Sequence, residues 1–95
     1  MSAPVERLRI AATHPSLPGH FPGRPVVPGV VLLDRVAAAL ERDGARLARL
    51  GAVKFLAPLL PEQDAELHLQ RDGARVRFRI ERDGVPILSG DGELA

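Results

Sequence analysis

One segment of this 95-residue chain constrains its fold more than any other: residues 28–43, with the sequence PGVVLLDRVAAALERD. Between Gly29 and Leu40 the only polar side chains are those of Asp34 and Arg35. Proline is tolerated in the first turn of a helix, and Gly44 is well placed to end it. Because a helix that is apolar on nearly every side is normally buried, the segment predicts one long helix wrapped by a sheet.

Alternation of apolar and polar residues with a period of two predicts strands on both sides of this helix. Residues 5–12 predict the first strand, and Ile10 lies on its apolar face. Residues 47–58 predict the second strand, with Val53 and Phe55 facing the core. Two prolines close this strand, since proline cannot donate a hydrogen bond to a sheet.

Two turn signals divide the remainder of the chain into hairpin strands. The first turn is at residues 71–73, and the second is Asp83-Gly84, which leads into residues 85–94. Six apolar residues flank the first turn at strand spacing: Ala65, Leu67, Leu69, Val76, Phe78 and Ile80. The sequence therefore predicts an α+β fold, an antiparallel sheet of about five strands around one long central helix, as a single domain over residues 1–95.

A proline- and glycine-rich loop, residues 13–27, leads into the N-terminus of the predicted helix. The first amides of a helix have no partner inside it and lie at its positive end, so a carbonyl oxygen or an oxyanion is stabilised there. Gly29 allows a ligand to approach the backbone closely. His20 lies in the loop, and Asp34 lies inside the helix fourteen residues later. The two side chains of one chain therefore need not meet. Across the two-fold axis of a dimer, the histidine of one subunit could face the aspartate of the other.

Composition excludes several classes of function. The chain has no cysteine, so neither a disulfide nor a thiolate nucleophile is available. A net charge of +1 and only three aromatic residues argue against nucleic-acid binding. The histidines, at positions 14, 20 and 68, lack the paired spacing of a metal site. Neither a signal-peptide pattern nor an apolar run of membrane length is present, so we expect a cytoplasmic protein that does not bind membranes.

The motif HFPGRPV at residues 20–26, followed by Pro28-Gly29-Val30 and by an acid fourteen residues after the histidine, resembles a known family signature. It is similar to that of the (3R)-hydroxyacyl-[acyl carrier protein] dehydratases, which have the hot-dog fold. The segment VKFLAPLLPEQD, residues 53–64, resembles a further strand and turn of that family. The compact length is similar to small stand-alone members of aryl-polyene and other specialised acyl pathways.

This resemblance implies dehydration of a 3-hydroxyacyl thioester to a trans-2-enoyl thioester, without a cofactor, in the synthesis of fatty acids or related acyl and polyene chains. The substrate would be carried by acyl carrier protein or coenzyme A. By analogy His20 removes the proton next to the thioester, and Asp34 of the partner subunit in a homodimer assists loss of the hydroxyl. The Gly29 N–H would polarise the thioester carbonyl, and the Val26 carbonyl would orient the His20 ring. Phe21 and Val30 would complete the substrate site.

Several features of the sequence depart from the family or have a simpler interpretation. Residues 61–64 read Pro-Glu-Gln-Asp, where the family has a Pro-Gly-Asp turn. Tyrosine and tryptophan are absent, so an aromatic gate would have to use Phe21, Phe55 or Phe78. His68 is expected on the polar face of its strand. The arginines of residues 71–82 are expected to be solvated, with a docking patch for an acidic carrier protein as the alternative.

Two other functions remain open at this point. A hot-dog acyl thioesterase would use the same helix N-terminus to polarise a thioester, although usually without the HFPG loop. A catalytically idle acyl-binding or scaffolding subunit would keep the fold without the chemistry. The presence of both His20 and Asp34 argues for the dehydratase over either alternative.

Overall fold

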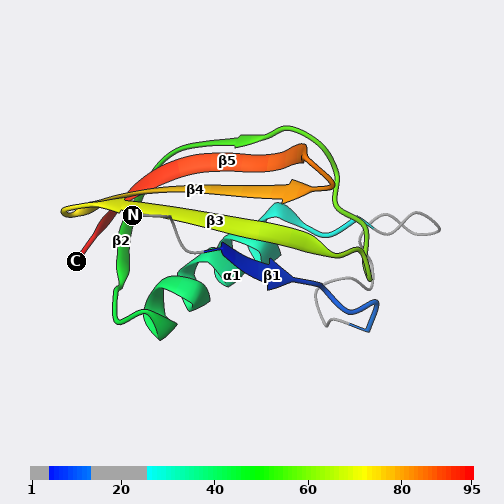
Figure 1. Ribbon diagram of the computed structural model, residues 1–95, viewed down its shortest axis with the longest axis horizontal. Coiled ribbons are helices and arrows are strands. Elements are labelled where there is room, and N and C mark those ends of the chain that lie inside the picture. Colours follow the sequence, from blue (N-terminus) through cyan, green and yellow to red (C-terminus); the bar gives the residue numbers. More distant parts are fainter. Residues whose placement is uncertain (1–4, 14–25) are drawn as a thin grey trace.

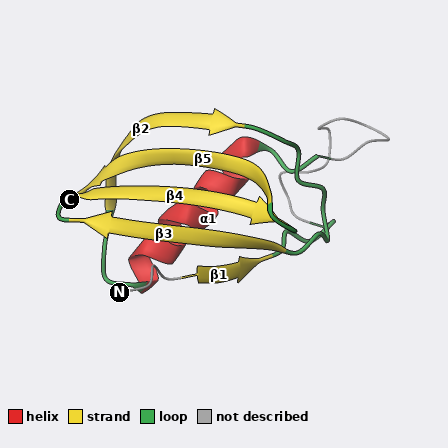
Figure 2. Ribbon diagram, turned by 45° about the horizontal axis from the view of Figure 1, so that its top comes forward, coloured by secondary structure: helices red, strands yellow, loops and turns green. Residues whose placement is uncertain are grey.

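The computed structural model describes residues 5–13 and 26–95. In this part of the chain, one helix packs against a single five-stranded antiparallel sheet (Figure 1). The elements are β1 (Val5–Leu8), α1 (Gly29–Arg42), β2 (Leu47–Phe55), β3 (Ala65–Asp72), β4 (Arg75–Arg82) and β5 (Val85–Leu94). The strand order is β1-β3-β4-β5-β2, and α1 crosses one face of the sheet diagonally (Figure 2). The predicted architecture is confirmed.

The two predicted turns join β3, β4 and β5 into consecutive hairpins. Gly73 has a φ of 59°, and the Asp83-Gly84 pair has φ values of 50° and 78°. Positive φ at both central residues matches the right-handed twist of the flanking strands and favours Gly, Asp and Asn. In the second turn, Arg82 therefore pairs directly with Val85, and a shift between Ile80 and Glu81 then changes the register along the rest of the β4–β5 pair.

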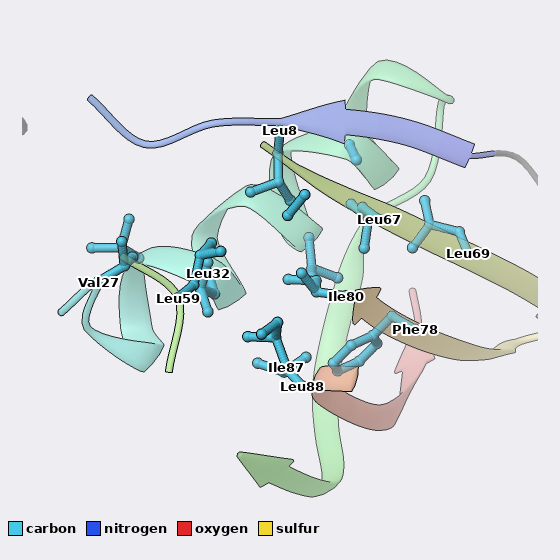
Figure 3. Packing of buried hydrophobic residues seen from close by; sticks show 14 of the residues in the cluster. Leu8, Val27, Leu32, Leu59, Leu67, Leu69, Phe78, Ile80, Ile87 and Leu88 are labelled. Carbon is cyan, nitrogen blue, oxygen red and sulfur yellow. The ribbon is translucent and has the colours of Figure 1, made fainter. Parts of the chain in front are cut away.

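The core lies between α1 and the inner face of the sheet (Figure 3). Leu67, Ile80 and Leu88 lie side by side on β3, β4 and β5, and each is fully buried. The helix adds Val36 and Leu40, which are also fully buried. All six residues predicted to face inward on β3 and β4 are buried.

The helix begins and ends close to the predicted residues, but it is not buried on every side. Val31, Leu32, Val36, Ala39 and Leu40 are buried against the sheet. The opposite face is exposed and carries Val30, Asp34 and Glu41. The expectation of all-round burial is wrong for the single chain, because the sheet covers only one side of the helix.

The last turn of α1 is closed by the predicted glycine. Gly44 has a φ of 80°, and its N–H donates to the Glu41 carbonyl at 3.0 Å. The N–H of Ala45 donates to the Leu40 carbonyl at 2.8 Å. These two bonds form a Schellman motif, which satisfies carbonyls that the helix itself cannot pair.

Strand β2 lies at the edge of the sheet, and most of its residues are exposed. Its pairing with β5 is interrupted by two register shifts, one of them between Leu50 and Val53. Phe55 pairs with Leu88 and so lies on the helix side of the sheet, as predicted. Its side chain is nevertheless 57% exposed, so the prediction that it belongs to the core is wrong. An edge strand has no neighbour on its outer side to cover such a side chain.

The first strand is shorter than predicted. β1 pairs with β3 only over Val5–Leu8, although Ile10 beyond it is buried. Ala12 is exposed and lies in a turn. The alternation of apolar residues thus continues past the last backbone pair.

In the described part of the chain, no helix is long and apolar enough to cross a membrane.

Candidate functional site

An apolar cavity of about 580 Å³ opens at the N-terminus of α1. Three segments form it: the residues before the helix, the first helical turn, and the end of β2 with the chain that follows. The lining residues are Val26, Val27, Pro28, Gly29, Leu32, Phe55, Leu56, Ala57, Pro58 and Leu59. None of these described lining residues is charged, so the cavity suits an acyl chain or another apolar group.

The helix N-terminus supplies the polar groups of this cavity. Pro28 is the N-cap residue and provides no side-chain hydrogen bond, and the first turn contains no acidic residue. The Pro28 carbonyl accepts from the N–H of Val31 at 3.0 Å. Among the described residues, the N–H groups of Gly29 and Val30 have no acceptor. The positive end of the helix dipole therefore remains available to a carbonyl oxygen in the cavity.

The ring of Phe55 lies directly over Gly29. A Cβ atom built on Gly29 would be 2.6 Å from Phe55 Cζ and 3.2 Å from Cδ1, both closer than side chains normally approach. A side chain at position 29 would therefore have to displace this ring. Phe55 also lines the cavity, and its side chain is more than half exposed.

The structure brings together only some of the predicted site residues. Val26 and Gly29 line the cavity. Val30 is 62% exposed and Asp34 is exposed, and neither lines it. Asp34 lies five residues into the helix, about 7.5 Å along its axis from Gly29. The cavity and the Asp34 carboxylate are thus on different surfaces of a single chain.

Two predicted site residues, His20 and Phe21, lie outside the described residues, as does His14. Of the other proposed aromatic gates, Phe55 lines the cavity, whereas Phe78 is buried in the core and does not. Phe78 is therefore excluded as a gate, because its ring is enclosed beneath the sheet.

The sequence interpretation missed Leu32, Leu56 and Leu59 as cavity residues. Leu59 is buried, and its carbonyl accepts from the N–H of Val27 at 2.8 Å. Pro58 and Pro61 are the sequence features from which these cavity residues could have been predicted, since they turn the chain after β2 back over the start of the helix.

A second groove, of about 560 Å³, lies on the outer face of the sheet. It is lined mainly by polar side chains, including Lys54, Arg77, Ser89 and the half-buried His68. We do not regard it as the site, because it is on the side of the sheet opposite to α1 and lacks the unpartnered amides of the helix N-terminus. Among residues 5–13 and 26–95, no cluster of His, Asp or Glu could hold a metal ion.

The ion pairs of the arginines in residues 71–82 indicate solvated strand positions and argue against a docking patch for an acidic carrier protein. Four of the five lie near an acidic neighbour: Arg71 with Asp43 (3.1 Å), Arg75 with Asp91 (3.8 Å), Arg79 with Glu81 (2.8 Å) and Arg82 with Asp83 (3.3 Å). These pairs are largely exposed and each contributes little to stability, about 0–1 kcal/mol. They do, however, neutralise most of the charge that a docking patch would need.

Comparison with known proteins identifies relatives of the chain. Its residues 3–91 match the ApeI-like family, described as ApeI dehydratase. A 3-hydroxyacyl-[acyl-carrier-protein] dehydratase FabZ from Haemophilus influenzae (strain PittEE) is 36% identical over 101 aligned positions. That alignment covers 90% of this chain and 64% of the relative. The chain thus spans less than two thirds of the length of this relative.

Solved structures agree on the fold. A chain of the dehydratase heterocomplex ApeI:P from Xenorhabdus doucetiae superposes with a TM-score of 0.86 at 26% identity, covering 99% of this chain and 88% of its own. An uncharacterised protein from Erwinia carotovora subsp. atroseptica superposes with a TM-score of 0.70 at 27% identity, covering 96% and 81%. With a sequence match over nearly its whole length and the same five strands around one helix, the chain belongs to the ApeI-like dehydratase family and has the hot-dog fold.

Proposed function

We propose that the chain dehydrates a 3-hydroxyacyl thioester, carried by acyl carrier protein, to a trans-2-enoyl thioester. The observation that carries this proposal is the apolar cavity at a helix N-terminus whose first amides have no acceptor among residues 5–13 and 26–95. An acyl chain fits such a lining, and a thioester carbonyl fits the positive end of the helix. The name of the FabZ relative supports acyl carrier protein as the carrier, and coenzyme A is the alternative carrier to test.

The proposed reaction moves one proton and breaks one carbon–oxygen bond. The neutral imidazole of His20 takes a proton from C2, and negative charge develops on the thioester oxygen, which accepts a hydrogen bond from the Gly29 N–H. The electron pair then forms the C2–C3 double bond, while the hydroxyl leaves C3 and takes up the same proton from the His20 imidazolium to become water, which returns His20 to its neutral form. The atoms balance with water as the only co-product, so the reaction needs no redox or group-transfer cofactor. One preorganised donor to such an oxyanion typically contributes about 3–4 kcal/mol.

The remaining roles follow the same scheme. Asp34 hydrogen-bonds the departing hydroxyl, and the Val26 carbonyl orients the His20 ring. Phe21 and Val30 complete the substrate surface. We place the reaction in the cytoplasm, in the synthesis of fatty acids or related acyl chains.

We propose further that the enzyme is a homodimer in which each site combines His20 of one chain with Asp34 of the other. Two observations support this. Asp34 lies on the face of α1 that the sheet leaves exposed, away from the cavity of its own chain. The neighbouring edge strand β2 also leaves apolar side chains exposed, including Leu50 at 42%. A second copy would cover both surfaces.

The first test follows enoyl thioester absorbance with 3-hydroxyacyl groups on acyl carrier protein and on coenzyme A. We expect turnover by the wild type and losses of at least about 100-fold in His20→Ala and Asp34→Asn, as for removal of a positioned acid or base. Release of free thiol instead would establish a thioesterase. Acyl binding without turnover on either carrier would establish an idle binding subunit.

Mixing the two inactive variants tests the shared site. In a mixed dimer, one of the two sites receives both an intact His20 and an intact Asp34. Random exchange of subunits should therefore restore about one quarter of the wild-type activity. If both residues served a site within one chain, the mixture would remain inactive.

A further inference from the structure

The connection between β2 and β3, residues 56–64, holds both ends of the segment that carries His20. At the exit of that segment, the N–H of Val27 donates to the Leu59 carbonyl at 2.8 Å. At its entry, the N–H of Glu62 donates to the Ile10 carbonyl at 2.8 Å. Ile10, Val27 and Leu59 are all buried, so the backbone at both anchor points is held by the core.

Glu62 adds a side-chain contact at the entry. Its Oε2 accepts a hydrogen bond from the N–H of Ala12 at 3.2 Å. Its Oε1 lies 3.9 Å from Nη1 of Arg9, whose Nε is 3.1 Å from Oδ1 of Asp64. The carboxylate therefore extends the anchor from Ile10 to Ala12, the second residue before the segment 14–25 begins.

A glutamate is unexpected at position 62 because of the backbone conformation there. Glu62 has a φ of 66°, in the left-handed region where a residue with a Cβ is disfavoured and glycine is not. Its side chain is 54% exposed, so packing in the core does not explain why a glutamate stands there. A glycine would lose the bond to the Ala12 N–H, together with the longer and exposed contact to Arg9.

We propose that Glu62 is a positioning residue for the loop that carries the catalytic His20. This inference rests on the proposed function. Without the carboxylate, the stretch between the anchors described at its two ends extends from residues 13–26 to residues 11–26. Loop-closure entropy changes little with such an extension, so stability is hardly affected. Placement of the base is affected more, because a displacement of about 1 Å at a reacting group can lower a rate by about 100-fold.

The test compares Glu62→Gly with Glu62→Gln. Glycine relieves the unfavourable φ but removes the acceptor, so we expect a Tm within about 3 °C of the wild type. We expect kcat to fall about tenfold with KM unchanged, because the acyl cavity is intact. The amide of Ala12 should also lose protection from hydrogen exchange. Glutamine keeps an oxygen acceptor, so Glu62→Gln should retain most of the wild-type kcat.

Gln63→Ala is the matched control. Gln63 stabilises the same turn through Oε1, which accepts from the N–H of Leu60 at 3.0 Å, whereas the side-chain bonds to Arg9 and Ala12 come from Glu62 and Asp64. Its kcat should stay at the wild-type value. The proposal is overturned by a wild-type kcat in Glu62→Gly, by failure of glutamine to restore kcat, or by an equal loss in Gln63→Ala. An inactive wild type would instead overturn the proposed function itself, and the exchange of the Ala12 amide would still report on the anchor.

Discussion

At the scale of single residues, the Gly29–Phe55 contact connects packing to the site. Gly29 begins α1 and lines the apolar cavity, and the ring of Phe55 occupies the space that a Cβ at position 29 would need. Phe55 is also exposed on the edge strand. One aromatic ring therefore packs against the first residue of the helix, while more than half of its surface stays exposed.

We expect Gly29→Ala and Phe55→Ala to be non-additive in stability. The alanine at 29 displaces the ring in the wild type but meets no ring when Phe55 is absent. The coupling energy should be about 0.5–1 kcal/mol, measured by urea unfolding of the wild type, both single variants and the double variant. Gly44→Ala, at the other end of the helix, should be additive with Phe55→Ala. Additivity of the Gly29 pair to within about 0.3 kcal/mol would contradict the contact.

At the scale of elements, the two ends of α1 differ in how their free backbone groups are capped. Its N-terminus is left uncapped by side chains and faces the cavity. Its C-terminus is closed by the Schellman motif at Gly44. Stability is thus provided at the end away from the cavity, while the amides at the cavity remain available to a ligand.

Gly44→Ala tests the C-terminal cap. A Cβ at this position would meet nothing within 4 Å, so the only penalty is the left-handed backbone at φ 80°. We expect a loss of about 1 kcal/mol in the free energy of unfolding, measured in urea. Gly44→Asn should lose less, because asparagine tolerates this conformation better. An alanine variant as stable as the wild type would show that the helix ends differently in solution.

At the scale of the whole molecule, the two edges of the sheet differ. β1 has four residues, whereas β2 has nine and exposes Leu50 and Phe55. A long exposed edge with apolar side chains is a surface that proteins normally cover. Because β2 also lies beside α1, which exposes Asp34, this edge is the one where a second copy would complete the site.

If the proposed dimer and activity hold, Leu50→Glu should yield a monomer that no longer dehydrates the substrate, because it places a charge on the proposed interface. Sedimentation velocity and the enoyl absorbance assay measure the two effects. Val85→Glu is the control, since Val85 is similarly exposed at 47% but lies next to the β4–β5 turn. It should remain dimeric and active. A dimeric, active Leu50→Glu variant would place the interface elsewhere.

Much of the fold could be predicted because its signals are local. The period of 3.6 in residues 28–43 and the Asp-Gly turns depend only on neighbouring residues, and they predicted α1 and the hairpins within a few positions. The inward residues of β3 and β4 followed from their alternation. Of the candidate site, Val26 and Gly29 line the same cavity, whereas the side chain of Phe78 is buried in the core and does not line it. The roles predicted for the site residues stay predictions.

The sequence by itself determined the helix, the hairpins, the inward faces and the motif of the family, because each depends on residues that are close together in the chain. Only the tertiary structure decided that β2 lies at the edge, that one face of α1 stays exposed, and that Phe55 covers Gly29. It also brought Glu62 to Ala12, fifty positions away in sequence. Such contacts depend on the strand order β1-β3-β4-β5-β2, which arises from packing of the whole sheet against the helix and leaves no local pattern to detect.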